Sequence, residues 1–194
     1  MNGERGQSRS PPALVRIAKD GRPWSARFDE EAQAIRRAVA GEPELFHIGS
    51  TAIPEMLAKP ILDLLGAVRS LERFDAASSA LVALGYEAMG PYGIAGRRYF
   101  RKIDLAGTRS HHLHVFSSGS PHISRHLALR DYLRAHPKVA DAYGALKTSL
   151  ATRPGATWAS YVEGKAAFVA ATERDALAWR EEPQGTAPGG VAGA

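Results

Sequence analysis

Apolar positions along the chain follow two periods, that of a helix and that of a strand. Over residues 24–39 they recur every three or four positions, which predicts an amphipathic helix ending before Gly41. A second helix is expected over 71–84, with Ser70 as its N-cap and Gly85 at its end. Continuous or alternating apolar runs predict strands at 13–18, 45–48, 60–68, 86–89, 97–105 and 111–116.

From residue 120 onward the pattern is helical. Ser120-Pro121 is a helix-start signal, whereas Pro137 and the segment 153–155 mark breaks. We expect three helices there, the last one long, with Tyr161 and Phe168 on one of its faces. The sequence therefore predicts an α/β (α+β) fold, in which a helical C-terminal third packs against a sheet-containing part.

Length and composition are those of one globular domain. A chain of 194 residues with 44% hydrophobic content can bury a core, and we place the domain at 13–182. The ends, 1–12 and 183–194, are polar or glycine-rich, so we expect a flexible N-terminal tail and a disordered C-terminal one. No apolar run is long enough for a membrane span or a signal peptide, which favours a cytoplasmic location.

The charge and the cysteine content limit the kinds of partner and of metal site that the chain can have. The chain has no cysteine, which excludes disulfides and thiolate metal sites. Its net charge of +5 is spread along the chain instead of forming a basic stripe interleaved with aromatics, so nucleic-acid binding is not expected. These cations are either a solvated surface or, in part, a local cluster around an anionic ligand.

Gly49-Ser50 stands between a predicted strand and a short predicted helix, whose first turn tolerates Pro54. Glycine lets a backbone approach a ligand closely, and the first N–H groups of a helix have no partner within it. Ser50 and Thr51 add hydroxyl donors. Most Gly-Ser pairs are simple turns, but this arrangement suits a phosphate or a carboxylate.

Asp63 interrupts the apolar run 60–68, where an unpaired carboxylate would be costly to bury. Either backbone donors or Lys59 satisfy it, or it lies at the end of its strand and faces a cation. With the Gly-Ser turn close in sequence, the second interpretation is favoured. The turn would hold a phosphate, and Asp63 would bind its metal.

Three histidines follow in the segment 109–115. In a strand, His112 and His114 share one face and His111 points to the other. Two imidazoles at this spacing can chelate a metal or act as a base and an anion donor, although a solvated polar strand face is the alternative. His47, which precedes the Gly-Ser turn, is expected to face the same cavity.

Two lysines lie at the edges of apolar helix faces, Lys147 and Lys165. Such lysines usually extend to solvent, and the alternative is that they reach an anion bound at the Gly-Ser turn. His122 and His126 are expected on the surface of a helix start. The cations that could support such an anion are Lys59, Arg98, Arg130 and Lys147.

The motifs resemble those of the GrpB family over roughly residues 13–175. The segments that carry the resemblance are His-Ile-Gly-Ser-Thr-Ala-Ile-Pro, Ala-Lys-Pro-Ile-Leu-Asp, Arg-Ser-His-His-Leu-His-Val, Leu-Arg-Asp-Tyr-Leu-Arg-Ala-His-Pro, Tyr-Gly-Ala-Leu-Lys and Tyr-Val-Glu-Gly-Lys. This family is assigned to the nucleotidyltransferase superfamily. The resemblance implies a mixed β-sheet flanked by helices and a site for a nucleotide or another phosphorylated or anionic small molecule.

The resemblance also implies roles for individual residues. Gly49 and Ser50 match the phosphate-holding turn of the superfamily, and Asp63 matches its first metal-binding carboxylate. The second carboxylate is expected two residues later, but position 65 is Leu65. The third is expected on a later strand, where His112 and His114 stand instead, and imidazoles suit Zn²⁺ or Mn²⁺ better than Mg²⁺. Candidate catalytic residues are Asp63 and His114, and candidate metal ligands are Asp63, His112 and His114.

Three functions remain open. One is metal-dependent transfer on a nucleotide or a similar substrate, with Asp104 as a further oxygen donor. Another is a catalytically lapsed module that binds an anionic ligand or a protein, favoured by Leu65. The third is acid–base chemistry run by the histidines and Asp63 on a biosynthetic intermediate, with a pH–rate limb near neutrality that depends on His114.

Overall fold

The computed structural model describes residues 10–181, apart from 17, 19, 40–42 and 105–106. The expected flexible tail over 1–12 falls almost entirely outside this part of the chain, as do the expected C-terminal tail and Gly41. Among the described residues, none of the helices is long and apolar enough to cross a bilayer.

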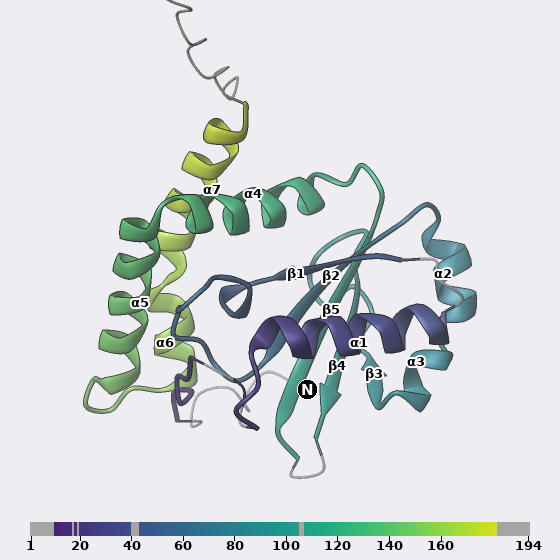
Figure 1. The fold of residues 1–194 in the computed structure, drawn as a ribbon, viewed down its shortest axis with the longest axis horizontal. Coiled ribbons are helices and arrows are strands. Elements are labelled where there is room, and N and C mark those ends of the chain that lie inside the picture. The colour runs from purple at the N-terminus through teal and green to yellow at the C-terminus, as the bar shows by residue number, and fades with distance from the viewer. Residues whose placement is uncertain (1–9, 17, 19, 40–42, 105–106, 182–194) are drawn as a thin grey trace, which may run out of the picture.

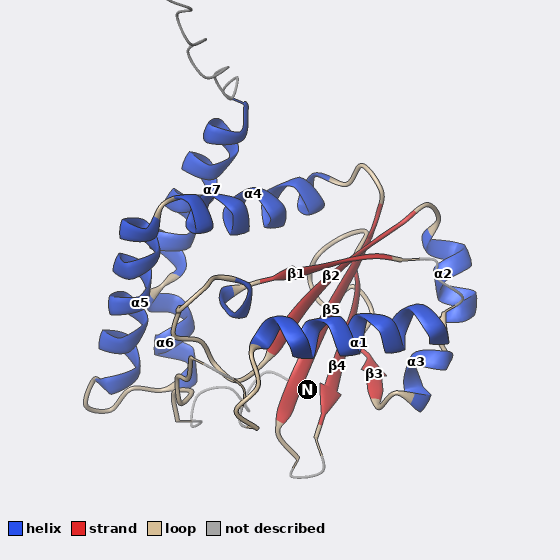
Figure 2. Cartoon of the chain, viewed as in Figure 1, coloured by secondary structure: helices blue, strands red, loops and turns tan. Residues whose placement is uncertain are grey.

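A five-stranded mixed sheet, in the order β1-β2-β5-β4-β3, forms the centre of the molecule. Its parallel pair is β2 with β5, and its other neighbouring strands are antiparallel. The mixed sheet flanked by helices is therefore confirmed (Figures 1 and 2). The strands are β1 Glu44–Ile48, β2 Leu62–Val68, β3 Tyr86–Ala88, β4 Arg98–Ile103 and β5 Arg109–Ser117.

One face of the sheet is covered by helix α1, Trp24–Ala38, which crosses it obliquely in Figure 1. The helix buries Ala32 and Ile35 against Leu64 and Leu113, whose side chains point to this face. Two short helices, α2 Leu71–Ala77 and α3 Ala80–Ala83, complete this layer at the β3 edge. This is the larger apolar core of the protein.

The helical C-terminal third covers part of the other face (Figure 1). Its helices are α4 Pro121–Ala135, α5 Pro137–Thr152, α6 Trp158–Gly164 and α7 Ala166–Glu181. Helix α4 meets the sheet through Leu127, which packs with Leu65 and Phe116. Beside this contact, Asp63 of β2 and His114 of β5 line a cavity together with residues of α4, α5 and α7.

Four predicted elements differ in the structure. Of the strand predicted over 13–18, residue 17 lies outside the described residues, and Val15 forms an isolated bridge with Ala58. The helix after Gly49 is a single 3₁₀ turn, Ser50–Ala52, which ends before Pro54. The helix over 71–84 is split into α2 and α3. The long final helix is likewise two helices, separated at Lys165.

Candidate functional site

The turn at Gly49 lies directly against Asp63. Gly49 has a φ of +72°, which side chains rarely adopt, and a Cβ there would lie 2.6 Å from Asp63 Oδ2. The neighbouring strands place the two residues together, because Ile48 is paired with Asp63 across β1 and β2. Glycine is therefore needed at position 49 both for the backbone conformation and for the space that the carboxylate occupies.

Asp63, His112 and His114 form one cluster on this face of the sheet. Parallel pairing of β2 with β5 puts Asp63 opposite His112, and His112 Nδ1 lies 2.9 Å from Asp63 Oδ1. The potential ligand atoms of the three residues all lie within 4.8 Å of one another. The period of two therefore brought the predicted metal candidates together, and His111 points to the opposite face as expected.

The pKa values of Asp63 and His114 in this cluster are both lowered, which leaves the carboxyl group charged and the imidazole neutral. Burial raises the pKa of the Asp63 carboxyl, but the charge of Lys59 and the hydrogen bond from His112 outweigh it, so the pKa lies well below its usual range. Burial lowers the pKa of His114 to about 3. At neutral pH the cluster thus contains a carboxylate and a neutral imidazole, which is the protonation state that a cation would require.

The donor set fits a divalent cation. A carboxylate accepts only, so His112 donates from Nδ1–H, and in its neutral form the lone pair is on Nε2. That Nε2 is buried and has no hydrogen-bond partner among the described residues. An imidazole oriented by a carboxylate, with its other nitrogen free, is a common arrangement at metal sites. One oxygen and two nitrogens suit Mn²⁺ or Zn²⁺ better than Mg²⁺.

The second carboxylate of a two-metal site is missing. Leu65 is fully buried and packs with Ile48, Phe116 and Leu127 in an apolar cluster. Asp104, considered as a replacement, accepts a hydrogen bond from Thr108 N in the β4–β5 hairpin, on the α1 side of the sheet. It therefore contributes nothing to the cluster around Asp63.

Lysines line the site on the side of the Gly-Ser turn. Lys147 is 1% exposed and donates to Ser50 Oγ at 3.1 Å and to the carbonyl oxygen of Leu57. Lysines at the edge of an apolar helix face usually extend to solvent, but the Lys147 side chain does not. A cavity of about 20 Å³ is shared by Lys147, Lys165 and Lys59 with Ser50, Thr51 and Asp63.

The ammonium groups around this small cavity destabilise one another. Burial and the charge of Lys165 lower the pKa of Lys147 to about 7. Burial and the charge of Lys59 lower the pKa of Lys165 to about 8. Burial is the largest cause of both shifts and a neighbouring ammonium the second, so an anion bound beside these lysines would stabilise their charged forms.

On the other side of Ser50 and Asp63 lies a larger cavity of about 210 Å³. Its walls are mostly apolar and come from the Gly-Ser segment and from α4, α5 and α7, including Ile53, Leu133, Tyr143 and Val169. Arg130 lines it and donates to Asp131 and to the carbonyl oxygen of His47. A ligand could thus place an anionic group among the lysines and an apolar or ring-shaped group here.

The structure adds residues that sequence reasoning missed. His126, expected at the surface, lines the larger cavity with its ring 5.8 Å from that of His114. Tyr99 packs its ring against both His112 and His114. Arg97 is 7% exposed, and its Nη1 lies 3.4 Å from His114 Nδ1. Tyr99 pairs with His114 across β4 and β5, so the alternation of side chains along β4 could have indicated it. No local sequence pattern indicates Arg97 or His126.

Two predicted ligand-binding side chains lie elsewhere. The His47 ring stacks on Phe28 of α1 and lies 2.9 Å from Thr51 Oγ1, so it faces the α1 side. In β1 it is Phe46 and Ile48 that face the helical third. Arg98 forms an ion pair with Asp75 at 2.7 Å, beside α2. The structure does not bring either side chain to Asp63.

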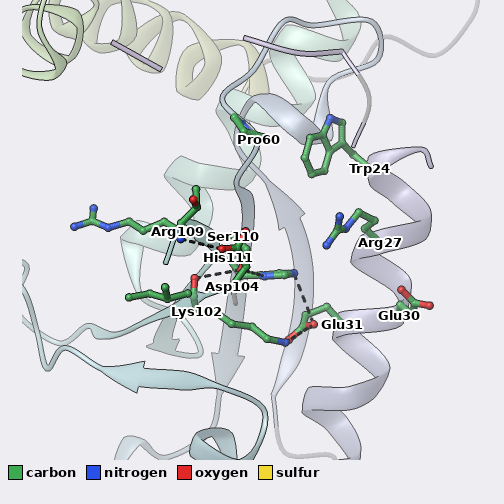
Figure 3. Close-up of a pocket in the computed structure, with 12 residues that line it drawn as sticks. Trp24, Arg27, Glu30, Glu31, Pro60, Lys102, Asp104, Arg109, Ser110 and His111 are labelled. Atoms are coloured by element: carbon green, nitrogen blue, oxygen red, sulfur yellow. Dashed lines mark hydrogen bonds and ion pairs between the residues drawn. The ribbon is translucent and has the colours of Figure 1, made fainter. Parts of the chain in front are cut away.

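A separate cavity of about 430 Å³ lies on the α1 side of the sheet (Figure 3). There Lys102 of β4 contacts Glu31 of α1 at 2.9 Å, and His111 Nε2 lies 3.7 Å from the same carboxylate. The lining holds three basic side chains, Arg27, Lys102 and Arg109, and three acidic ones, Glu30, Glu31 and Asp104, so no excess charge marks this cavity for a ligand.

Fold and site together define an α/β protein whose mixed sheet carries a carboxylate–imidazole cluster beneath a glycine turn. A family model described as GrpB protein matches residues 14–175. The chain belongs to the GrpB family, as its motifs predicted.

Relatives and a solved structure agree with this assignment. The UPF0157 protein YqkA of Bacillus subtilis (strain 168) is 41% identical over 172 residues, which are 88% of this chain and 50% of YqkA. The chain thus spans half the length of that relative. The glutamate-rich protein GrpB of Alkalihalophilus pseudofirmus is 35% identical over 153 residues, covering 75% of this chain and 86% of that protein.

The crystal structure of conserved protein GrpB from Enterococcus faecalis has a TM-score of 0.78 and 36% identity. It covers 87% of this chain and 99% of the other. A structure of the Cid1 poly(U) polymerase with MgGTP bound matches at a TM-score of 0.48 and 17% identity, over 69% of this chain and 43% of that one. Similarity at that level supports no inference about function.

Proposed function

We propose that this protein binds a nucleotide or another phosphorylated small molecule at the Gly49–Asp63 centre. The observation that carries the proposal is the lysine group, in which Lys147 and Lys165 are held beside Ser50 with depressed pKa values. Burying ammonium groups side by side lowers stability, and a bound polyanion would reverse that effect. The motif-based link to nucleotidyltransferases supports the same ligand class.

A divalent cation belongs to this proposal. Asp63 and His112 would hold it, and His114 lies beside them. When bound, such an ion neutralises charge on phosphoryl oxygens. The chain's own groups would orient the ligand: lysines at its anionic end, and Tyr143 with Leu133 around its apolar part.

The test uses two lysine variants of one helix. Lys147→Met removes the buried ammonium, and Lys138→Met removes an exposed one from the same helix, α5. Thermal unfolding is followed with MnCl₂ and, in turn, ATP, GTP, CTP, UTP, pyrophosphate and inorganic phosphate. We expect at least one compound to stabilise the wild type and Lys138→Met equally, by about 2.7 kcal/mol at 100 times its Kd, and Lys147→Met to lose that effect.

Two results would contradict the proposal. Either no compound stabilises the wild type, or Lys147→Met responds like Lys138→Met. Misfolding is not expected to confuse the comparison, because replacing a buried charge with an apolar side chain of similar volume is commonly neutral or stabilising.

The second candidate is a binding module without transfer chemistry, and buried Leu65 favours it. Pyrophosphate release from the stabilising nucleotide separates the two. Transfer activity predicts release that Asp63→Ala abolishes, whereas a lapsed site predicts binding with no release in either protein. For the acid–base alternative, burial lowers the pKa of His114 to about 3, so the pH–rate profiles of the wild type and of His114→Ala are its test: a limb near neutrality that is lost in His114→Ala would favour it.

A further inference from the structure

Arg97 is a buried guanidinium beside the candidate metal centre. It has no carboxylate partner among the described ion pairs. Instead its Nε donates to the carbonyl oxygen of Pro91 at 3.1 Å and its Nη2 to that of Tyr92 at 2.6 Å. Its guanidinium carbon lies 5.0 Å from the centre of the Tyr99 ring. These contacts fix the guanidinium in place and leave Nη1 directed at His114 Nδ1, 3.4 Å away.

A guanidinium has five N–H donors and no acceptor. The ring nitrogen that faces Nη1 must therefore present its lone pair, so Nδ1 of His114 is the acceptor. A neutral imidazole carries one proton, and for His114 that proton then belongs to Nε2. His112 is in the opposite state, because the Asp63 carboxylate requires the proton on its Nδ1.

We propose that Arg97 is a positioning residue that fixes His114 as an N–H donor and so keeps it out of the metal coordination sphere. The two strand neighbours then have different tasks. His112 Nε2, buried and without a partner, offers a lone pair to the cation. His114, which lines the larger cavity with Asp63, offers Nε2–H to the bound ligand. The donor role toward a ligand rests on the proposed function, whereas the proton placement does not.

The variants that separate these roles are Arg97→Gln and Arg97→Lys. Lysine retains a donor-only side chain, whereas the glutamine amide oxygen can accept a proton from His114 Nδ1. Long-range ¹H–¹⁵N correlation spectra of ring-labelled protein at pH 7 report the tautomer of each histidine. We expect Nε2–H for His114 and Nδ1–H for His112 in the wild type, no change in Arg97→Lys, and a population of Nδ1–H His114 in Arg97→Gln.

Mn²⁺ and Zn²⁺ titrations, without nucleotide, give the second readout. His112→Ala should lose about 10- to 100-fold in affinity, as for a lost ligand or orienting partner, and His114→Ala less than about threefold. Arg97→Gln should bind the cation more tightly than Arg97→Lys, because it frees His114 Nε2 to coordinate. A purely structural role for Arg97 would not produce this gain, and circular dichroism checks that both variants fold.

Equal losses in His112→Ala and His114→Ala, or a wild-type His114 protonated on Nδ1, would overturn the inference. If the wild type binds neither cation, the metal part of the proposed function fails. The tautomer spectra still decide the role of Arg97 in that case.

Discussion

At the scale of single residues, the site depends on the absence of a side chain at Gly49. Among the described glycines with positive φ, Gly49 is the one at which a Cβ would meet a carboxylate, with 2.6 Å to Asp63 Oδ2. Gly155 has the same φ of +72° and nothing within 4 Å of a built Cβ. Gly49 also has a ψ of −172°, a backbone region that is essentially restricted to glycine, so the pair compares an open glycine with one at which both the backbone and Asp63 oppose a side chain.

Gly155→Ala is expected to lower the free energy of unfolding by about 1–2 kcal/mol, the cost of a left-handed alanine. Gly49→Ala should cost more by about a further 1–3 kcal/mol, because its ψ of −172° is poorly tolerated by alanine and its Cβ also displaces a hydrogen-bonded carboxylate. Urea unfolding of both variants measures the difference. It should be accompanied by weaker Mn²⁺ binding only in Gly49→Ala, and equal losses in the two would show that Asp63 does not depend on the turn.

Lys147 gives stability a specific pH dependence. Its pKa is about 7 in the folded protein and about 10.4 when unfolded, so between these values the unfolded state binds the extra proton. The free energy of unfolding therefore rises with pH over this window, by up to about 1.4 kcal/mol per unit, and the contribution is flat below pH 7.

Urea unfolding at pH 6, 7, 8 and 9 tests this in the wild type and in Lys147→Met. Lys147→Met is expected to be the more stable protein at pH 6, and the difference should shrink as pH rises. Lys165 is present in both proteins, and because its charge lowers the pKa of Lys147, the difference reports Lys147 together with its coupling to Lys165. Parallel pH profiles would mean that the Lys147 ammonium is not destabilised by its surroundings.

Residue-level sequence patterns predicted part of this site for a clear reason. His112 and His114 share a face because they are two apart in one strand, and that is a local property. His47 was placed on the wrong side because the choice depends on the register of β1 against β2, in which His47 pairs with Leu64 and not with Asp63. Arg97 comes to His114 through a strand pairing and a turn that no local pattern specifies.

At the scale of elements, the sequence predicted most strands and α1, because their apolar periods are clear. The predictions that failed concern two helices, over 71–84 and at the C-terminal end, each of which is divided in two in the structure. The final helix divides at Lys165 because α6 must pack closely on α5, and Gly164 permits this: a Cβ there would lie 2.4 Å from Leu150 Cδ2. That contact belongs to tertiary structure, so helical spacing alone predicted one continuous helix.

Gly164→Ala should therefore be destabilising by about 1–3 kcal/mol, since Leu150 is buried and must shift. In a Leu150→Ala background the clash is gone, and the same substitution should stabilise by roughly 0.5–1 kcal/mol through helix propensity. A double-mutant cycle by urea unfolding measures this change of sign. A destabilising effect of similar size in both backgrounds would assign the cost to the backbone of α6 and not to its packing on α5.

At the scale of the whole molecule, the site exists only where the two parts of the chain meet. The sheet supplies Asp63, His112 and His114, whereas the helical third supplies Lys147 and Lys165. Arg130, Arg134 and Lys147 donate to carbonyl oxygens of His47, Ala52 and Leu57 and so hold the segment around the Gly-Ser turn. Ligand binding and docking of the helices should consequently be coupled.

Leu133→Ala tests that coupling, because Leu133 packs with Ile53, Met56 and Tyr143 where the helices meet the turn segment. Losing this buried side chain should lower the free energy of unfolding by about 2–5 kcal/mol. If the two parts form one cooperative unit, tryptophan fluorescence and far-UV circular dichroism will report the same shifted transition. Leu177→Ala, at a side chain 37% exposed on α7, serves as the control and should change little.

The same variant separates docking from ligand chemistry. Leu133 lines the larger cavity but has no charge, so its loss leaves the lysine group and the carboxylate–imidazole cluster chemically unchanged. Weaker stabilisation by pyrophosphate or inorganic phosphate, which have no apolar part to contact Leu133, with Mn²⁺ affinity retained in Leu133→Ala, would place the anion site on the docked helices and the cation site on the sheet. Because Lys147 reaches Ser50 from α5 and Lys165 lines the same small cavity from the α6–α7 junction, a loosened helical third should lose the anion first. Equal loss of anion and cation binding would instead show that the sheet cluster itself depends on the helices above it.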